Sequence, residues 1–80
     1  MSTNVPELNG LAQLESKFRT ALNRYARLLL KADKGKLEGD ELDILLNTGL
    51  RMRQHARELG LTRKQLESML ERASLHLESR

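Results

Sequence analysis

Apolar residues in the first third of the chain recur at alternating intervals of three and four, which is the spacing of one face of an α-helix. The series is Leu11, Leu14, Phe18, Ala21, Tyr25 and Leu28. Leu22 and Leu29 widen this stripe, and Leu8, Ala26 and Leu30 lie on its flank. The pattern predicts a long helix over about residues 7–32, with an apolar face wider than one neighbouring helix covers.

A second helix is predicted over about residues 40–59, after a loop at residues 33–39 that carries two glycines and alternating charge. Asp40 is its expected cap. Its apolar stripe comprises Leu42, Leu45, Leu46, Gly49, Met52, Ala56 and Leu59. Glycine is unfavourable inside a helix. Gly49 on this stripe therefore predicts a close backbone approach to the first helix.

The start of the third helix has the clearest local signal. Gly60 fits the residue that ends a helix in the left-handed conformation. Thr62 and Gln65 then match the capping box, in which threonine caps the helix and glutamine reaches back. The third helix is expected over about residues 63–77. Its apolar stripe comprises Leu66, Met69, Leu70, Ala73 and Leu77.

Composition supports a helical fold. Leucine accounts for 18 of the 80 residues, whereas Val5 and Ile44 are the only aliphatic β-branched residues. Strands favour β-branched and aromatic residues, and the chain has only two aromatic residues. We therefore expect an all-α fold with one domain over residues 1–80, in which three helices form a small bundle with a long N-terminal helix. Residues 1–6 are expected to be disordered.

The width of the first apolar face predicts self-association. A chain of this size buries only about 60–65% of its unfolded surface, so a lone monomer gains little stability. We therefore predict a homodimer, or a partner helix, on the first helix. The candidate interface residues are Leu11, Leu14, Phe18, Leu22, Tyr25 and Leu29. The alternative is that Leu8, Ala26 and Leu30 wrap a three-helix core.

The second helix has a mixed face opposite its apolar stripe. Ile44, Thr48, Arg51 and His55 follow each other at intervals of four, three and four. An isoleucine there has no core to enter in a simple bundle, and apolar residues among cations are typical of surfaces that protein partners use. The candidate partner-binding residues are Leu30, Ile44, Arg51, His55 and Leu75. The alternative is that these are isolated apolar residues of an ordinary surface.

Residues 51–64 concentrate the positive charge of the chain. They contain five cations and one anion, so their local charge of +4 exceeds the net charge of +3 for the whole chain. This basic stretch suits an acidic protein surface or a nucleic-acid backbone. It equally suits a solvated helix end whose arginines complement the helix dipole.

Residues 52–71 resemble the helix-turn-helix motif of DNA-binding proteins. The resemblance rests on the small residue Ala56, the turn Leu59-Gly60-Leu61, and the apolar residues Leu66 and Met69. It implies a recognition helix at residues 62–72. The implied DNA contacts are Thr62, Arg63, Lys64, Glu67 and Ser68. His55 departs from the motif, where an apolar residue is usual, and the two glutamates at 67 and 71 oppose attraction to phosphates.

No residue pattern indicates catalysis or metal binding. The chain has no cysteine and two histidines, and it lacks a phosphate loop, a Ser–His–Asp set and zinc-ligand spacing. We expect no enzyme activity, no catalytic or metal-binding residues, no cofactor and no small-molecule substrate. The first 20 residues contain charges and no apolar run of secretory type, so we expect a cytoplasmic protein without a membrane span.

The function expected from the sequence is that of a small α-helical regulator or adaptor. It would bind a protein partner through its helix faces, as a homodimer. The alternative function is a DNA-binding transcriptional regulator that uses the helix-turn-helix resemblance. Both functions depend on surface residues. The adaptor function requires the candidate partner-binding residues to be exposed, whereas the DNA-binding function requires exposed residues on the implied recognition helix.

Overall fold

The computed structural model describes residues 6–78, with side chains described from residue 10 onward. Three helices follow each other along the chain: α1 (Pro6–Asp33), α2 (Glu41–Glu58) and α3 (Arg63–Glu78). Residues 6–78 contain no strand. The predicted all-α, three-helix fold is therefore confirmed, with each helix end within one residue of its expected position. The disorder expected at residues 1–6 concerns residues outside this range, except Pro6, which begins α1.

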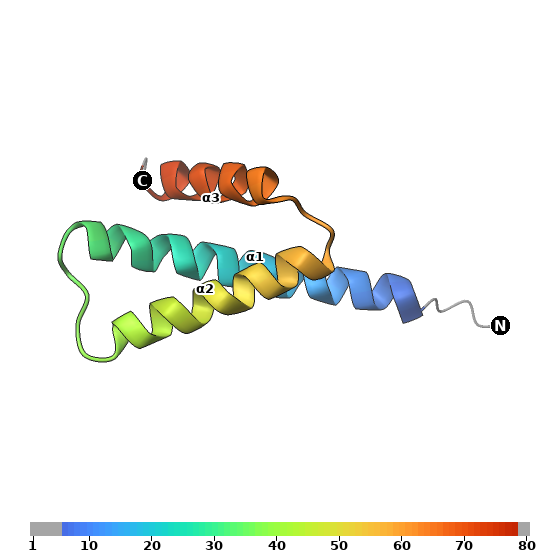
Figure 1. Cartoon of the computed structure of the whole chain (residues 1–80), viewed down its shortest axis with the longest axis horizontal. Helices are drawn as coiled ribbons and strands as arrows, with labels where there is room; N and C mark the ends of the chain where they lie inside the picture. The colour runs from blue at the N-terminus through green and yellow to red at the C-terminus, as the bar shows by residue number, and fades with distance from the viewer. Residues whose placement is uncertain (1–5, 79–80) are drawn as a thin grey trace.

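The long helix α1 forms the spine of the molecule. Helices α2 and α3 each pack principally against α1, and Figure 1 shows them lying along it with the first turns of α1 projecting beyond both. The molecule is consequently elongated, with extents of 54 × 25 × 24 Å. Two helices of the same chain thus cover the wide apolar face of α1.

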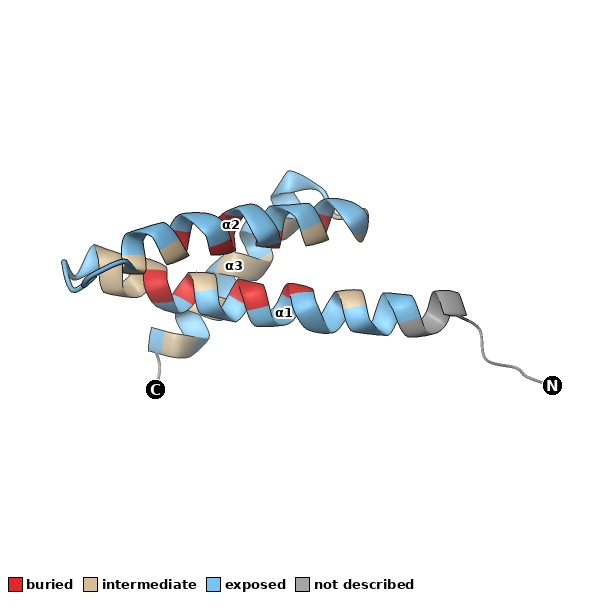
Figure 2. Cartoon of the chain, turned by 90° about the horizontal axis from the view of Figure 1, so that it is seen from below, coloured by how far each residue is buried: buried red, intermediate tan, exposed pale blue. Residues whose placement is uncertain are grey.

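The core lies where the middle of α1 meets α2. Its largest fully buried side chains are Phe18, which is 2% exposed, and Met52, which is 1% exposed. Ala21, Leu22 and Ala56 complete this cluster. Helix α3 adds only half-buried apolar residues and has no buried residue of its own. Figure 2 shows the buried positions confined to the facing sides of α1 and α2.

A hydrogen-bonded glycine turn ends α2 as predicted. Gly60 has a φ of 79°, in the left-handed region where glycine is favoured. The backbone N–H of Leu61 donates to the carbonyl of Ala56 at 2.9 Å, and that of Gly60 donates to Arg57 at 3.0 Å. This pair of bonds is the Schellman arrangement. It turns the chain from α2 towards α3 within a few residues.

The capping predictions have two different outcomes. The Thr62 N–H donates to Gln65 Oε1 at 2.9 Å, and the Gln65 N–H donates to Thr62 Oγ1 at 3.1 Å, so the capping box is confirmed. Asp40 occupies the N-cap position of α2 as expected, but its side chain makes no capping hydrogen bond. Glu41 instead accepts a hydrogen bond from the backbone N–H of Glu38 at 2.9 Å.

Candidate functional site

Helix α2 carries three leucines on a side that no other described part of the chain covers. Leu42, Leu46 and Leu50 are 55%, 59% and 60% exposed. They are spaced four residues apart and therefore form one stripe about 12 Å long. We call these three residues the leucine face. Only part of the apolar stripe predicted for this helix is buried, because α2 packs on α1 through Leu45, Gly49, Met52 and Ala56, whereas Leu42 and Leu46 face away.

Opposite charges flank the two ends of the leucine face. Arg53 and Arg57 continue the stripe beyond Leu50, and both are exposed. At the other end, exposed carboxylates stand at Glu38, Asp40 and Asp43. The face therefore has an acidic end, an apolar centre and a basic end.

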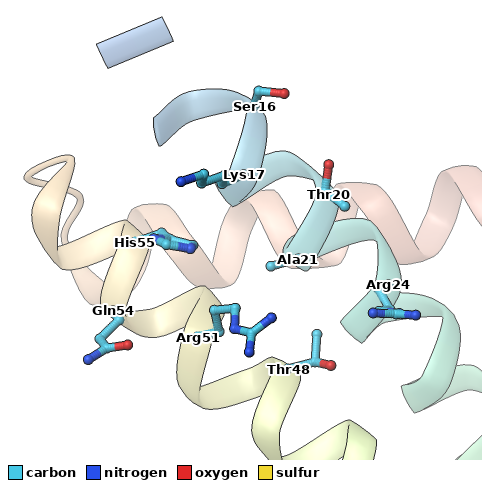
Figure 3. A pocket seen from close by; sticks show the side chains of 9 residues that line it. All are labelled: Ser16, Lys17, Thr20, Ala21, Arg24, Thr48, Arg51, Gln54 and His55. Carbon is cyan, nitrogen blue, oxygen red and sulfur yellow. The ribbon is translucent and has the colours of Figure 1, made fainter. Parts of the chain in front are cut away.

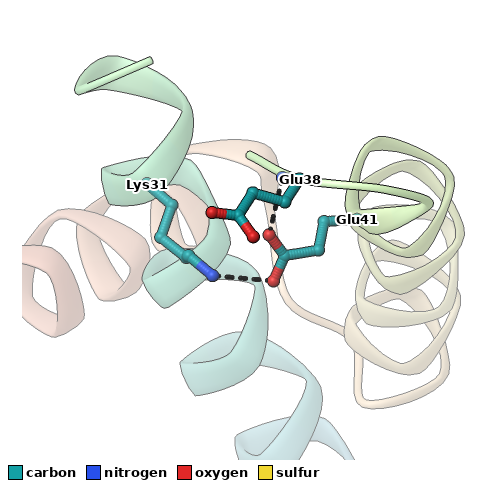
Figure 4. Close-up of polar contacts among 3 residues, drawn as sticks. All are labelled: Lys31, Glu38 and Glu41. Carbon is teal, nitrogen blue, oxygen red and sulfur yellow. Dashed lines mark hydrogen bonds and ion pairs between the residues drawn. The ribbon is translucent and has the colours of Figure 1, made fainter. Parts of the chain in front are cut away.

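An ion pair fixes the acidic end of α2 to the last turn of α1. Lys31 Nζ donates to Glu41 Oε2 at 2.7 Å, and the other oxygen of this carboxylate accepts from Glu38 (Figure 4). The hydrogen bond from Lys31 lowers the pKa of Glu41 below its ordinary value, and the Glu38 N–H lowers it further. Partial desolvation opposes this shift. The ion pair closes the α1–α2 hairpin across the 34–40 loop.

A groove of about 540 Å³ runs between α1 and α2. Lys17 and Arg24 line it from α1, and Arg51 and His55 line it from α2. Figure 3 shows Arg51 and His55 extending from α2 towards α1, and Lys17 extending from α1 towards α2. The remaining lining residues are Ser16, Thr20, Ala21, Thr48 and Gln54, so no carboxylate lines it. We call this the basic groove.

His55 has a carboxylate neighbour at the edge of the basic groove. Its Nδ1 lies 3.4 Å from Glu58 Oε1, one helical turn further along α2. The His55 side chain is mostly covered, whereas that of Glu58 is 62% exposed. This contact holds the imidazole beside the groove while the glutamate remains in solvent.

A second groove, of about 530 Å³, lies between α2 and α3. Tyr25, Met52 and Leu66 contribute apolar lining, and Arg53, Arg57, Arg63 and Glu67 contribute charge. The five residues that the helix-turn-helix resemblance assigns to DNA contact are all exposed: Thr62, Arg63, Lys64, Glu67 and Ser68. The Thr62 hydroxyl already serves as the acceptor of the capping box.

The predicted partner residues differ in exposure and in their place in the fold. Arg51 and His55 line the basic groove together. Leu30 and Ile44 are half-buried. Leu75 is 58% exposed on α3 and lines neither groove.

Most of the residues predicted for a dimer interface on α1 are covered within the fold of a single chain. Phe18 and Leu22 are buried in the core. Leu14, Tyr25 and Leu29 are half-buried, and only Leu11 is largely exposed, at 51%. The apolar surface left for a partner lies mainly on α2.

The described residues also limit two further kinds of site. Within this part of the chain, no helix has the length and hydropathy required to span a bilayer. The same residues hold no group of three or more histidine, cysteine or carboxylate side chains placed to bind a metal ion.

Comparison with protein-family models finds no match, and searches of the curated proteins and of the solved structures likewise find none.

Proposed function

We propose that the protein is a non-catalytic helical binding module that works as a homodimer through the leucine face of α2. The observation that carries this proposal is the row of three leucines, each more than half exposed, at successive turns of one helix. Apolar side chains gathered in this way are typical of surfaces that associate. The occupant that best suits this face is the same face of a second copy.

The leucine face is complementary to itself when two copies of α2 run antiparallel. With Leu46 at the twofold axis, Leu42 of one chain comes level with Leu50 of the other. Arg53 then lies within about one helical turn of Asp43 of the second chain. Such an isologous contact closes after two copies, because each patch is satisfied by its equivalent.

The expected dimer is weak and reversible. Full burial of a leucine side chain contributes about 1.5–3 kcal/mol, and each leucine of this face is already 40–45% covered in the monomer. Burying the remainder contributes about 1 kcal/mol per leucine. Exposed ion pairs add little, and association opposes all of these gains with lost rotational and translational freedom. We therefore expect dissociation at low protein concentration.

Analytical ultracentrifugation of Leu46→Glu tests the proposal. The wild type is expected to shift from monomer to dimer as its concentration rises, and Leu46→Glu is expected to stay monomeric. Leu75→Glu is the matched control, because Leu75 on α3 is exposed to nearly the same extent. A wild type that stays monomeric at high concentration, or a control that loses association equally, contradicts the proposal.

A charge exchange identifies the second copy as the occupant. Asp43→Arg and Arg53→Glu are each expected to weaken the dimer, because each places like charges near each other across the twofold axis. The double variant restores opposite charges and is expected to recover much of the association. Recovery is specific to self-pairing, since a different partner would not carry the compensating change. No recovery contradicts the antiparallel arrangement.

A further inference from the structure

We propose that the basic groove between α1 and α2 binds a small ligand that carries two or more phosphate groups. This site goes beyond the proposed dimer, because it uses a different side of α2. Thr48, Arg51 and His55 project from α2 roughly opposite to the leucine face. The two surfaces can therefore be occupied independently.

Three cationic side chains line the groove, and no carboxylate is among its lining residues. Lys17 and Arg24 come from α1, and Arg51 comes from α2. None of them forms an ion pair within residues 10–78. Like charges brought together across a helix–helix contact repel each other. A ligand with at least two negative charges relieves this repulsion, and arginine binds phosphate oxygens through paired hydrogen bonds.

The rest of the lining supplies uncharged hydrogen-bonding groups. Thr20 and Ser16 offer hydroxyl groups from α1, and Gln54 offers an amide from α2. Thr48 is a polar residue that is only 8% exposed, yet its side chain reaches the groove. These groups can donate to phosphate oxygens or accept from the rest of a ligand. The volume of about 540 Å³ falls in the range of sites for small organic molecules.

The fold holds the two sides of the groove at a fixed separation. The core residue Ala21 also lines the groove, so its floor belongs to the contact between α1 and α2. At the loop end of this hairpin, Lys31 and Glu41 join the same two helices. The cationic side chains therefore project from a preformed scaffold, which lowers the entropic cost of binding.

Titration with sodium pyrophosphate, followed by amide chemical shifts in two-dimensional NMR at constant ionic strength, tests the site. We expect saturable shifts at the backbone amides around Thr20 and Thr48, with chloride and sulfate giving much weaker effects. Arg51→Gln and Arg24→Gln are each expected to weaken binding about tenfold. Arg27→Gln is the matched control, because Arg27 is an exposed arginine of α1 that lines neither groove.

Three results would overturn the proposed phosphate site. Equal weakening by Arg27→Gln would reduce the effect to general attraction by a chain of net charge +3 and would overturn the site. Shifts spread over the whole surface, without saturation, would also overturn it. A short DNA duplex provides the last comparison. If the duplex binds in an Arg51-dependent way and pyrophosphate does not, the small-ligand proposal is wrong and the groove contacts nucleic acid.

Discussion

The ring of Tyr25 on α1 lies directly against the backbone of Gly49 on α2. A β-carbon built on Gly49 would lie 2.7 Å from Tyr25 Cε1 and 3.3 Å from Cδ1 and Cζ. The first of these distances is shorter than van der Waals contact allows. Gly49 therefore has the packing role on α1 that its position predicts, but its neighbour is the Tyr25 side chain, and the absence of a side chain at Gly49 is what lets the tyrosine ring fit.

Gly49→Ala is expected to destabilise the protein. Alanine favours a helix interior over glycine by about 1 kcal/mol, but here its methyl group must displace the Tyr25 ring, and overpacking costs about 1–3 kcal/mol. We expect a net loss of about 1 kcal/mol in urea unfolding. In a Tyr25→Ala background the same substitution is expected to become stabilising, because the clash is gone. A stabilising effect in both backgrounds would contradict the steric account.

The Glu41–Lys31 pair predicts a specific loss of stability in acid. The folded pKa of Glu41 is lowered, first by the hydrogen bond from Lys31. Its contribution to stability is therefore complete above the ordinary glutamate pKa and disappears as the pH falls through the lowered one. Urea unfolding of wild type and Glu41→Gln from about pH 7 to about pH 3 measures this.

The unfolding free energies of the wild type and of Glu41→Gln are expected to converge as the pH falls. Protonation of Glu41 removes from the wild type the ion pair with Lys31 that the substitution has already removed. Added salt is expected to reduce the difference at neutral pH, since both side chains are partly exposed. A difference that stays constant over the acid range would mean that the carboxylate charge does not stabilise the fold.

The capping box at the start of α3 predicts a measurable loss on removal of one hydroxyl. Thr62→Ala deprives the Gln65 N–H of its acceptor and is expected to lower the unfolding free energy by about 1 kcal/mol. Ser68→Ala is the control, because Ser68 is exposed later in α3, where the helix satisfies its own backbone. If both substitutions have the same effect, the cap contributes nothing specific.

Local signals in the sequence determine most of what could be predicted. Helix ends, the turn at Gly60 and the Thr62–Gln65 capping box depend on residues a few positions apart, so their physics is visible in the sequence itself. Gly49 could be interpreted because an interior glycine is costly and needs a packing reason.

The surfaces could not be predicted in the same way. A leucine stripe indicates that one side of a helix is apolar, but it does not indicate which part of that side a neighbouring helix covers. The apolar stripe of the second helix includes Leu42 and Leu46 beside Leu45, whereas α2 contacts α1 through a narrower sector that leaves these two leucines exposed. The basic groove joins residues of α1 to residues of α2 that lie far along the chain, so only the packed helices bring Arg24 and Arg51 together.

The absence of a fully buried residue in α3 has a consequence for how the molecule opens. Helix α3 makes the smaller of the two contacts with α1, and its own apolar side chains stay partly exposed, so its release requires less work than separating α1 from α2. Amide protons of α3 should accordingly exchange with deuterium sooner than those around Phe18 and Met52. The hairpin of α1 and α2 stays folded while α3 opens and closes.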